Sequence, residues 1–544
     1  MITDLVQEAN TRLKAETDVL IVGAGIAGIL LGVRLRQSGI RVVILESGNY
    51  SQPEEVHPLN RTVRLGEPYN GASGGRCRCL GGTSTIWGGA LIPFAPSDLL
   101  ARDYLGLSGF PVGPNEIEAY VPDLEKVFGV DAGSYEEEFV AETGIAKHVP
   151  TGDPDFKARF AKWPSFQKRN IATLFREFIQ ADDGLRIVLN STAVKFDVDR
   201  ETGVLRSVTG RHACGRSIDI VSKHCVICAG AIESTRLLLA LDRQNDERFL
   251  SASGALGRYF FDHHSRAMAS IEAKDIGRLN RLAGFRFVKS TMRSLRFELD
   301  ANAQRRERVP NAFGHISFKT DKPSAFDALR RFMRSRQMGM GASASELGEI
   351  IKDVPYLVEL GFWRFGYRQL LWPRPATYDL HVVAEQVPHY ENSIGLAEQT
   401  DIFGIPLVAI NWRVFDADLK PFLAYKRLFD AYWNRQGLAR VGALNWTDAS
   451  TIADRSLQVD VFHPGGTTRM GAESSAAVVD PELHVFNIRN LWTASTATFP
   501  SGGGANPTMT LMLFTLRLAD RLSRAIIAER QPLAAAGALS QAAA

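Results

Sequence analysis

The sequence predicts an α/β protein in which a parallel-sheet domain is joined to a second domain built on an antiparallel sheet. An apolar stretch at residues 18–22 runs directly into a glycine-rich turn at 23–28, and a second apolar stretch at 41–46 follows one helix length later. Strand candidates with alternating apolar and polar residues occur far downstream, at 293–299 and 377–386. A strand-turn-helix-strand unit is typical of parallel sheets, whereas alternation favours an antiparallel sheet with one face in water.

The turn after the first strand has the spacing GxGxxG, and Glu46 ends the next strand about 20 residues further on. This combination is the fingerprint of dinucleotide binding in a Rossmann-like unit. Its glycines let the backbone approach a pyrophosphate at a helix N-terminus, and the acid can accept a hydrogen bond from a ribose hydroxyl. We therefore expect the dinucleotide to contact Gly23, Gly25, Ile26, Ala27, Gly28 and Glu46.

The C-terminal part contains two further motifs, FHPGGTTRMG at residues 462–471 and GGGANPTMT at 502–510. Asn506 and Pro507 open an apolar periodic run, and these residue types are favoured at the N-cap and the first position of a helix. We expect a helix from Pro507, whose first N–H groups carry the positive end of the helix dipole. From this pattern, Asn506 either only caps the helix or also faces a ligand.

His463 lies in a Pro-Gly-Gly turn, where a single histidine is most often a surface residue. Histidine is also the side chain that can be neutral and accept a proton near neutral pH, so a catalytic base is the alternative. A base of this kind would give a rate that rises with pH through the ordinary pKa of imidazole.

These motifs resemble the glucose-methanol-choline (GMC) family of FAD-dependent oxidoreductases. Besides the two C-terminal motifs, GGTSTIWGGA at residues 81–90 resembles the family's flavin-side segment and CAGAIESTRL at 228–237 its second signature. The matches extend from about residue 18 to about residue 522. The resemblance implies bound FAD, a substrate domain of the p-hydroxybenzoate-hydroxylase-like type, and transfer of hydride from an alcohol carbon to the flavin.

The same resemblance assigns roles to individual residues. It implies that His463 accepts the hydroxyl proton and that Asn506 hydrogen-bonds the same oxygen. Further cofactor contacts are implied at Gly82, Thr83, Ser84, Trp87, Gly88, Gly89, Ala90, Val194, Ala229, Gly230, Ala494, Asn506, Pro507 and Thr508.

We predict that the FAD is bound non-covalently. Some sugar oxidases of the family tether FAD through a histidine of the flavin-side segment, but no histidine occurs here between His57 and His148. Cys77 and Cys79 lie in this stretch, and we interpret them as small buried side chains rather than as a thiol tether.

The motif set is similar to that of pyranose oxidases and bacterial glycoside dehydrogenases. This similarity implies oxidation of a sugar or glycoside ring hydroxyl to a keto group, with oxygen or a quinone-like compound as electron acceptor. The alternatives are oxidation of a non-sugar alcohol (sterol, cyclitol, aryl or aliphatic), a redox-neutral flavin-dependent lyase, and a catalytically silent FAD-binding protein. The oligomeric state stays open.

The domain organisation is expected to be discontinuous, because the cofactor motifs lie at the start, the middle and the end of the chain. With 544 residues the chain exceeds the size of a single core. We assign residues 1–100, 186–270 and 455–530 to the FAD-binding domain and residues 101–185 and 271–454 to the substrate-binding domain. Residues 531–544, rich in alanine, are expected to form a flexible tail.

Composition excludes several other classes of protein. The 63 basic and 60 acidic residues nearly balance, which argues against a nucleic-acid partner. The sequence has neither a transmembrane run nor a signal peptide, so we expect a cytoplasmic protein. Five cysteines, an odd number, fit a reducing compartment. Cys225 and Cys228 have CxxC spacing, but they fall on a strand expected at residues 223–228. Because the alternation of a strand sends them to opposite faces, we predict no metal site.

The region from about residue 305 to 375 has no counterpart in the family motifs. It contains a cluster of arginines at positions 330, 331, 334 and 336 and the aromatic stretch FWRFGYR at 362–368. We interpret the arginines as a solvated helix face and expect the aromatic stretch to pack internally or against another subunit. A membrane-surface or lid role is the alternative. Gly339 and Gly341 are expected to form a turn rather than a second nucleotide site.

Overall fold

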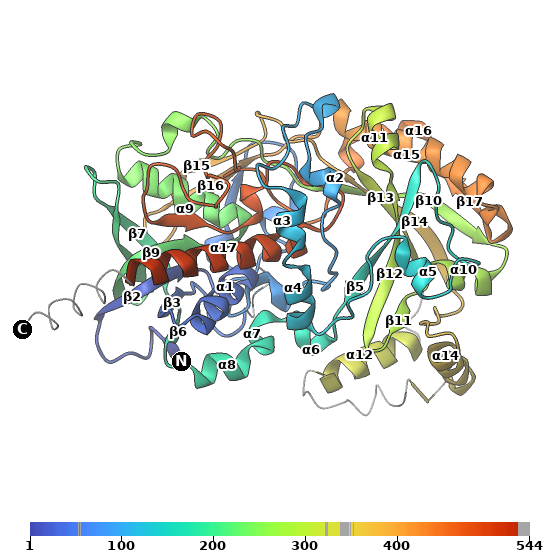
Figure 1. Ribbon diagram of the computed structural model, residues 1–544, viewed down its shortest axis with the longest axis horizontal. Helices are drawn as coiled ribbons and strands as arrows, with labels where there is room; N and C mark the ends of the chain where they lie inside the picture. The colour runs from blue at the N-terminus through green and yellow to red at the C-terminus, as the bar shows by residue number, and fades with distance from the viewer. Residues whose placement is uncertain are drawn as a thin grey trace, which may run out of the picture.

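The computed structural model describes residues 1–530 except 53, 55, 321–324, 338–347, 349 and 352. The turn expected at Gly339 and Gly341 and the tail expected at 531–544 therefore lie outside the described residues. The described elements form three sheets in two halves, with the first sheet in one half and the second sheet in the other (Figure 1).

The first sheet is eight-stranded and mostly parallel. Helix α1 (Ile26–Gln37) connects its two central N-terminal strands, α9 (Gly230–Gln244) follows the strand next to them, and α17 (Pro507–Arg530) packs along α1. The predicted strands at 18–22, 41–46 and 223–228 and the predicted helix start at Pro507 are confirmed. In spatial order the strands are β1 (Ile2–Asp4), β6 (Leu185–Leu189), β3 (Val42–Leu45), β2 (Arg12–Val22), β9 (Ser217–Ile227), β8 (Leu205–Arg211) and β7 (Thr192–Val198), with β19 (Leu491–Thr493) paired to β9.

The second sheet is eight-stranded and antiparallel, as the alternating sequences predicted. Helix α15 (Asp416–Arg435) packs against it through an aromatic cluster in which Phe156, Phe297 and Phe429 are buried. In spatial order the strands are β11 (Arg286–Val288), β12 (Thr291–Leu299), β13 (Ala312–Lys319), β14 (Thr377–Glu385), β10 (His263–Ala273) and β17 (Gly442–Trp446), with β5 (Phe156–Trp163) paired to β12 and β18 (Val459–Asp460) to β10.

A small third sheet connects distant parts of the chain. It contains β15 (Ser393–Thr400), β16 (Pro406–Asn411) and β4 (Thr62–Arg64), so strands from the segment assigned to the substrate domain pair with one from the segment assigned to the FAD domain. The limit that we placed at residue 270 falls inside β10, which belongs wholly to the second sheet. The domain limits stay a prediction.

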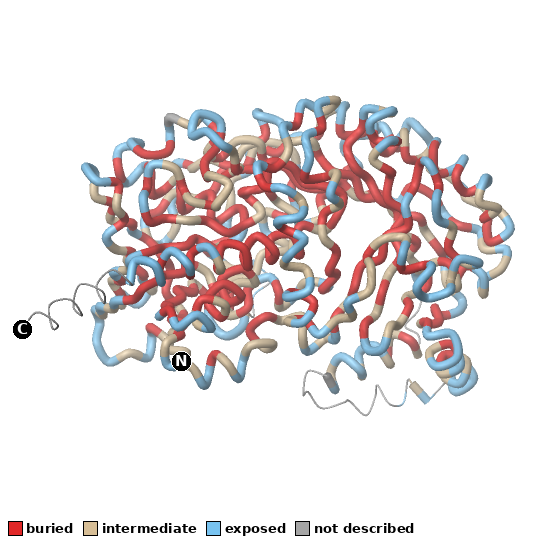
Figure 2. Tube along the Cα trace, in the orientation of Figure 1, coloured by how far each residue is buried: buried red, intermediate tan, exposed pale blue. Residues whose placement is uncertain are grey.

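The remaining helices cover the sheets and connect the halves. Buried backbone fills the interior of both halves, while the outer helices carry the exposed positions (Figure 2). Within the described residues, no helix is both long and apolar enough to cross a bilayer. The helices that cover the sheets and connect the halves are α2 (Pro96–Leu99), α3 (Pro114–Glu118), α4 (Val121–Phe128), α5 (Glu138–Glu142), α6 (Phe166–Arg169), α7 (Ile171–Leu174), α8 (Arg176–Ala181), α10 (Ile276–Ala283), α11 (Ala301–Glu307), α12 (Ala325–Gln337), α14 (Val354–Gly366) and α16 (Ala449–Ile452).

Candidate active site

The N-terminal ends of three helices line one cavity. Its wall includes Gly25 and Ile26 at the start of α1, Ala229 and Gly230 at the start of α9, and Pro507 at the start of α17. Helices α1 and α17 have no acidic residue in their first turns. The unpaired N–H groups and positive dipole ends of α1 and α17 therefore favour an anionic ligand in this cavity, whereas the first turn of α9 carries Glu233.

The glycines of the fingerprint turn serve different purposes. Gly23 has a φ of +107°, and a Cβ atom there would lie 2.6 Å from the carbonyl oxygen of Cys228. A Cβ atom on Gly28 would lie 1.9 Å from the carbonyl oxygen of Gly23. At Gly25, in contrast, a Cβ atom would meet nothing within 4 Å. Gly23 and Gly28 are thus required by the packing of the chain, whereas Gly25 leaves open space for a ligand.

Glu46 lines the cavity and also holds the fingerprint turn in place. Its two carboxylate oxygens accept hydrogen bonds from the backbone N–H groups of Ala24 at 2.9 Å and Gly48 at 2.8 Å. Burial raises the pKa of Glu46. Each oxygen keeps a further lone pair, so the carboxylate can also accept from a ribose hydroxyl.

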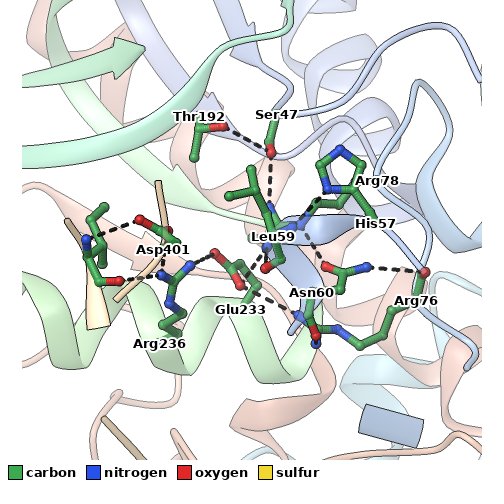
Figure 3. Close-up of polar contacts among 12 residues, drawn as sticks. Ser47, His57, Leu59, Asn60, Arg76, Arg78, Thr192, Glu233, Arg236 and Asp401 are labelled. Carbon is green, nitrogen blue, oxygen red and sulfur yellow. Dashed lines mark hydrogen bonds and ion pairs between the residues drawn. The ribbon is translucent and has the colours of Figure 1, made fainter. Parts of the chain in front are cut away.

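A buried network of charged side chains borders the cavity beside the start of α9 (Figure 3). Glu233 forms ion pairs with Arg78 at 2.7 Å, Arg236 at 3.1 Å and Arg76 at 3.5 Å, and Arg236 also pairs with Asp401 at 2.6 Å. Burial opposes the ionisation of Glu233, but Arg78, Arg236 and Arg76 together lower its pKa to about 2. Of these side chains, Arg76, Arg78 and Glu233 line the cavity, so two guanidinium groups stand beside one carboxylate at this part of the wall.

Two thiols lie at the same place. The Sγ atoms of Cys77 and Cys79 are 3.4 Å apart, and Cys77 lines the cavity. A hydrogen bond from Cys79 and a second from Thr85 lower the pKa of Cys77 to about 6, although burial opposes this shift. Cys79 is buried as we expected, whereas Cys77 is only partly buried.

A chain of hydrogen bonds connects two histidines and Asn506 at the other end of the cavity. His263 Nε2 lies 2.7 Å from the carbonyl oxygen of Gly503, which can only accept, so this nitrogen carries a proton. Nδ1 of neutral His263 is then an acceptor, and His463 Nδ1, 3.3 Å away, donates to it. His463 Nε2 is left as an acceptor, 3.1 Å from the amide nitrogen of Asn506. The network thus assigns His463 the tautomer with its lone pair on Nε2.

Charges around the histidine pair keep it neutral. Burial, then His263 and then Arg296 lower the pKa of His463 well below its ordinary value. Arg296 is itself buried and donates from Nη2 to Oδ1 of Asn506, which orients the amide nitrogen toward His463. Burial and the neighbouring Asp460 raise the pKa of Asp262 to about 7.

Asp262, His263 and His463 also have the arrangement of a candidate metal site, with ligand atoms within 4.8 Å of one another. The Asp262 carboxylate accepts from the Tyr69 hydroxyl at 2.7 Å and from the backbone N–H groups of His263 at 2.6 Å and His463 at 2.9 Å. Hydrogen bonding therefore accounts for this arrangement.

Most of the sequence-predicted residues lie on the cavity wall, and a few lie behind it. Val194 accepts from Gln244 through its carbonyl oxygen, and its neighbours Thr192 and Ala193 line the cavity instead. Asn506 lies behind His463. The predicted residues on the wall are Gly23, Gly25, Ile26, Ala27, Glu46, Gly82, Thr83, Ser84, Trp87, Ala229, Gly230, His463, Ala494, Pro507 and Thr508, and those off it are Gly28, Gly88, Gly89, Ala90, Val194 and Asn506.

Sequence reasoning missed the side chains that support the site. Arg76 and Arg78 had a signal in the Arg-Cys-Arg-Cys run after two glycines, which we interpreted only for its thiols. His263 and Arg296 lie on strands of the second sheet, where no local motif marks them as neighbours of the catalytic loop.

The fold and this site define a flavin-dependent oxidoreductase. Residues 16–55 match the family model described as FAD binding domain, and residues 388–515 match the one described as GMC oxidoreductase. The chain is thus an FAD-dependent oxidoreductase whose C-terminal part is similar to the GMC oxidoreductases. The open space at Gly25, the helix ends and the guanidinium groups of Arg76 and Arg78 on the wall fit FAD, an anionic dinucleotide.

Similar proteins cover nearly the whole chain at low identity. The 2-methyl-1,2-propanediol dehydrogenase of Mycolicibacterium austroafricanum is 21% identical over 94% of this chain and 95% of its own length. The fructose dehydrogenase large subunit of Gluconobacter japonicus is 22% identical, covering 93% and 97%. A solved structure of formate oxidase from Aspergillus oryzae RIB40 superposes with a TM-score of 0.56 at 16% identity, covering 94% of this chain and 98% of that one.

Proposed function

We propose that the enzyme oxidises a ring hydroxyl of a sugar or glycoside to a keto group, with His463 as the proton acceptor. When bound, FAD supplies the hydride acceptor at flavin N5. The alcohol oxygen displaces the Asn506 amide from His463 Nε2, so that Nε2 accepts the hydroxyl proton and the displaced amide donates to the same oxygen. General base catalysis of this kind contributes about 10² to 10⁴ in rate.

The observation that carries this proposal is the order of donors and acceptors from Gly503 to Asn506. The carbonyl of Gly503 fixes the tautomer of His263, which fixes that of His463. The lone pair on His463 Nε2 then lies beside Asn506 and next to the start of α17. A base whose tautomer is already set needs no change of tautomer before it accepts a proton, and only its contact with the Asn506 amide has to give way to the substrate.

The choice of a sugar rests on the motif resemblance and on the similarity to a fructose dehydrogenase. The equally extensive similarity to a 2-methyl-1,2-propanediol dehydrogenase favours a second candidate, oxidation of a small non-sugar alcohol. A redox-neutral lyase on the same fold is the third. The three differ in whether, and by which compound, the flavin is reduced.

Anaerobic stopped-flow reduction of the FAD-loaded enzyme tests these candidates. Glucose, fructose, a methyl glycoside, a vicinal diol, a sterol and a short alcohol would be mixed with the enzyme while flavin absorbance is followed. The proposal expects the fastest bleaching with one of the sugars, and much slower bleaching with its deoxy analogue because buried polar groups lose a partner. Faster reduction by the diol, sterol or short alcohol would overturn the sugar assignment, and no bleaching by any of them would favour a lyase.

Mixing the reduced enzyme with oxygen and, separately, with a quinone identifies the electron acceptor.

We also propose that FAD is held without a covalent bond. Acid precipitation should release intact FAD into the supernatant, whereas flavin retained in the pellet would point to a tether such as Cys77. All five cysteines are free thiols, which supports our inference of a reducing compartment.

A further inference from the structure

Helix α14 exposes a continuous apolar face. The positions along this face recur every three or four residues, so their side chains lie on one side of the helix. They are Val354, Val358, Phe362 and Phe365, exposed by 52%, 69%, 59% and 82%. We had expected the aromatic stretch to pack internally or against another subunit, yet both of its phenylalanines lie on this exposed side.

The opposite side of α14 is apolar as well. Leu360 and Trp363 are buried there in a cluster with Phe326 of α12 and with Leu371. A helix that is apolar on both sides is typical of an element with a partner on each of them. The cluster is the partner on one side, so the exposed side is the one without a partner among the described residues.

Helix α12 adds positive charge next to this surface. The shared cluster around Phe326 holds α12 against α14, and the two helices lie at the same end of the second half, both with exposed outer positions (Figures 1 and 2). Arg330, Arg331, Arg334 and Arg336 are all exposed, and Asp327 is the one acidic residue of α12. Exposed apolar side chains and exposed arginines at the same end of the molecule match the two components of an anionic lipid surface.

We propose that α14 and α12 dock this enzyme on a membrane surface that contains anionic lipids. The Phe362 and Phe365 side chains insert at the level of the headgroups, and the arginines of α12 contact lipid phosphates. A second copy of the chain is a poorer match for the same face. In a symmetric contact the same face meets itself, and α12, with Asp327 as its one acidic residue, offers little negative charge to the arginines of the other copy.

Vesicle flotation of the FAD-loaded enzyme tests this proposal. Vesicles of phosphatidylcholine with phosphatidylglycerol should carry the enzyme upward, and vesicles of phosphatidylcholine alone should carry much less. Replacing both phenylalanines (F362S and F365S) should weaken binding at least about tenfold, because two large apolar side chains no longer leave water. Replacing Arg330 and Arg334 by Gln should weaken vesicle binding about fivefold for each charge removed. Added salt should reduce the difference in binding between the original protein and this variant.

Ile402→Ser is the matched control, since Ile402 is 69% exposed outside this surface. It should bind as the original protein does. Flavin absorbance and the thermal midpoint should stay unchanged in every variant, and Phe365→Ser alone is the milder change if the double variant folds poorly. Equal flotation of original and variant proteins would overturn the proposal. A dimer in analytical ultracentrifugation that the double variant abolishes would also overturn it and assign the face to a second copy.

Discussion

The two ends of the cavity are built in different ways. The cofactor end consists mainly of backbone, with three helix N-termini and the fingerprint glycines around the space for FAD. The end that holds the base consists mainly of side chains. Here one hydrogen-bonded chain joins the buried Gly503, His263 and Arg296 with the partly buried His463 and Asn506. The cofactor end therefore depends on the positions at which the backbone needs glycine, whereas the base end depends on which atoms donate hydrogen bonds and which accept them.

Replacing the base should have the largest effect on catalysis. His463→Ala should slow anaerobic flavin reduction by about 10² or more, because the proton acceptor is lost while the three helix ends stay in place. The FAD content, measured by absorbance, should be unchanged. His484→Ala is the matched control, because this histidine bonds the carbonyl of Arg489 away from the cavity. Reduction of the His463 variant at the original rate would contradict the role given to this residue.

Substitution of the two fingerprint glycines separates the needs of the chain from those of the cofactor. Gly23→Ala should lower the free energy of unfolding even without FAD, by about 2 kcal/mol or more, because of its left-handed φ and its contact with Cys228. Gly25→Ala should leave the stability of the FAD-free protein unchanged and weaken FAD binding, since its Cβ would enter the ligand space. Thermal melts with and without FAD measure both effects. Equal changes of the thermal midpoint in the two variants, both with and without FAD, would contradict the different roles given to Gly23 and Gly25.

The difference between the two ends explains what the sequence could predict. Glu46 and the helix starts at Gly25 and Pro507 are set by spacing within a few residues, so they can be recognised locally. The contacts of His463 with His263 and of Arg296 with Asn506 join positions 200 and 210 residues apart, and no local pattern pairs them. The spacing predicted only a role toward ribose for Glu46 and did not show that its carboxylate also accepts from the backbone N–H groups of Ala24 and Gly48.

Removing the second histidine tests whether the tautomer of the base matters. His263→Phe keeps an aromatic ring next to His463 but removes the acceptor for His463 Nδ1, so the lone pair on Nε2 is no longer enforced. We expect kcat to fall about tenfold, the equivalent of one hydrogen bond, with KM nearly unchanged. The exchange also leaves the Gly503 carbonyl without its partner, which should cost about 1 kcal/mol in stability. A lower thermal midpoint with an unchanged kcat would show that His263 is only structural.

The dependence of flavin reduction on pH gives the smallest but most specific effect. The sequence alone predicted a rate that rises through the ordinary pKa of imidazole, about 6.5. Burial, His263 and Arg296 lower the pKa of His463 well below that value, so the neutral form that accepts the proton persists to lower pH. The rate should therefore fall through protonation of His463 only clearly below pH 6.5. Near pH 7 we expect only a shallow change in rate, due to Asp262, whose pKa is about 7 and whose carboxylate accepts from the backbone N–H of His463. Rates from stopped-flow reduction across this range, repeated with Asp262→Asn, separate the two groups. A tenfold fall per pH unit that starts at 6.5 in both proteins would show that His463 titrates as an ordinary exposed histidine and that its surroundings do not keep it neutral.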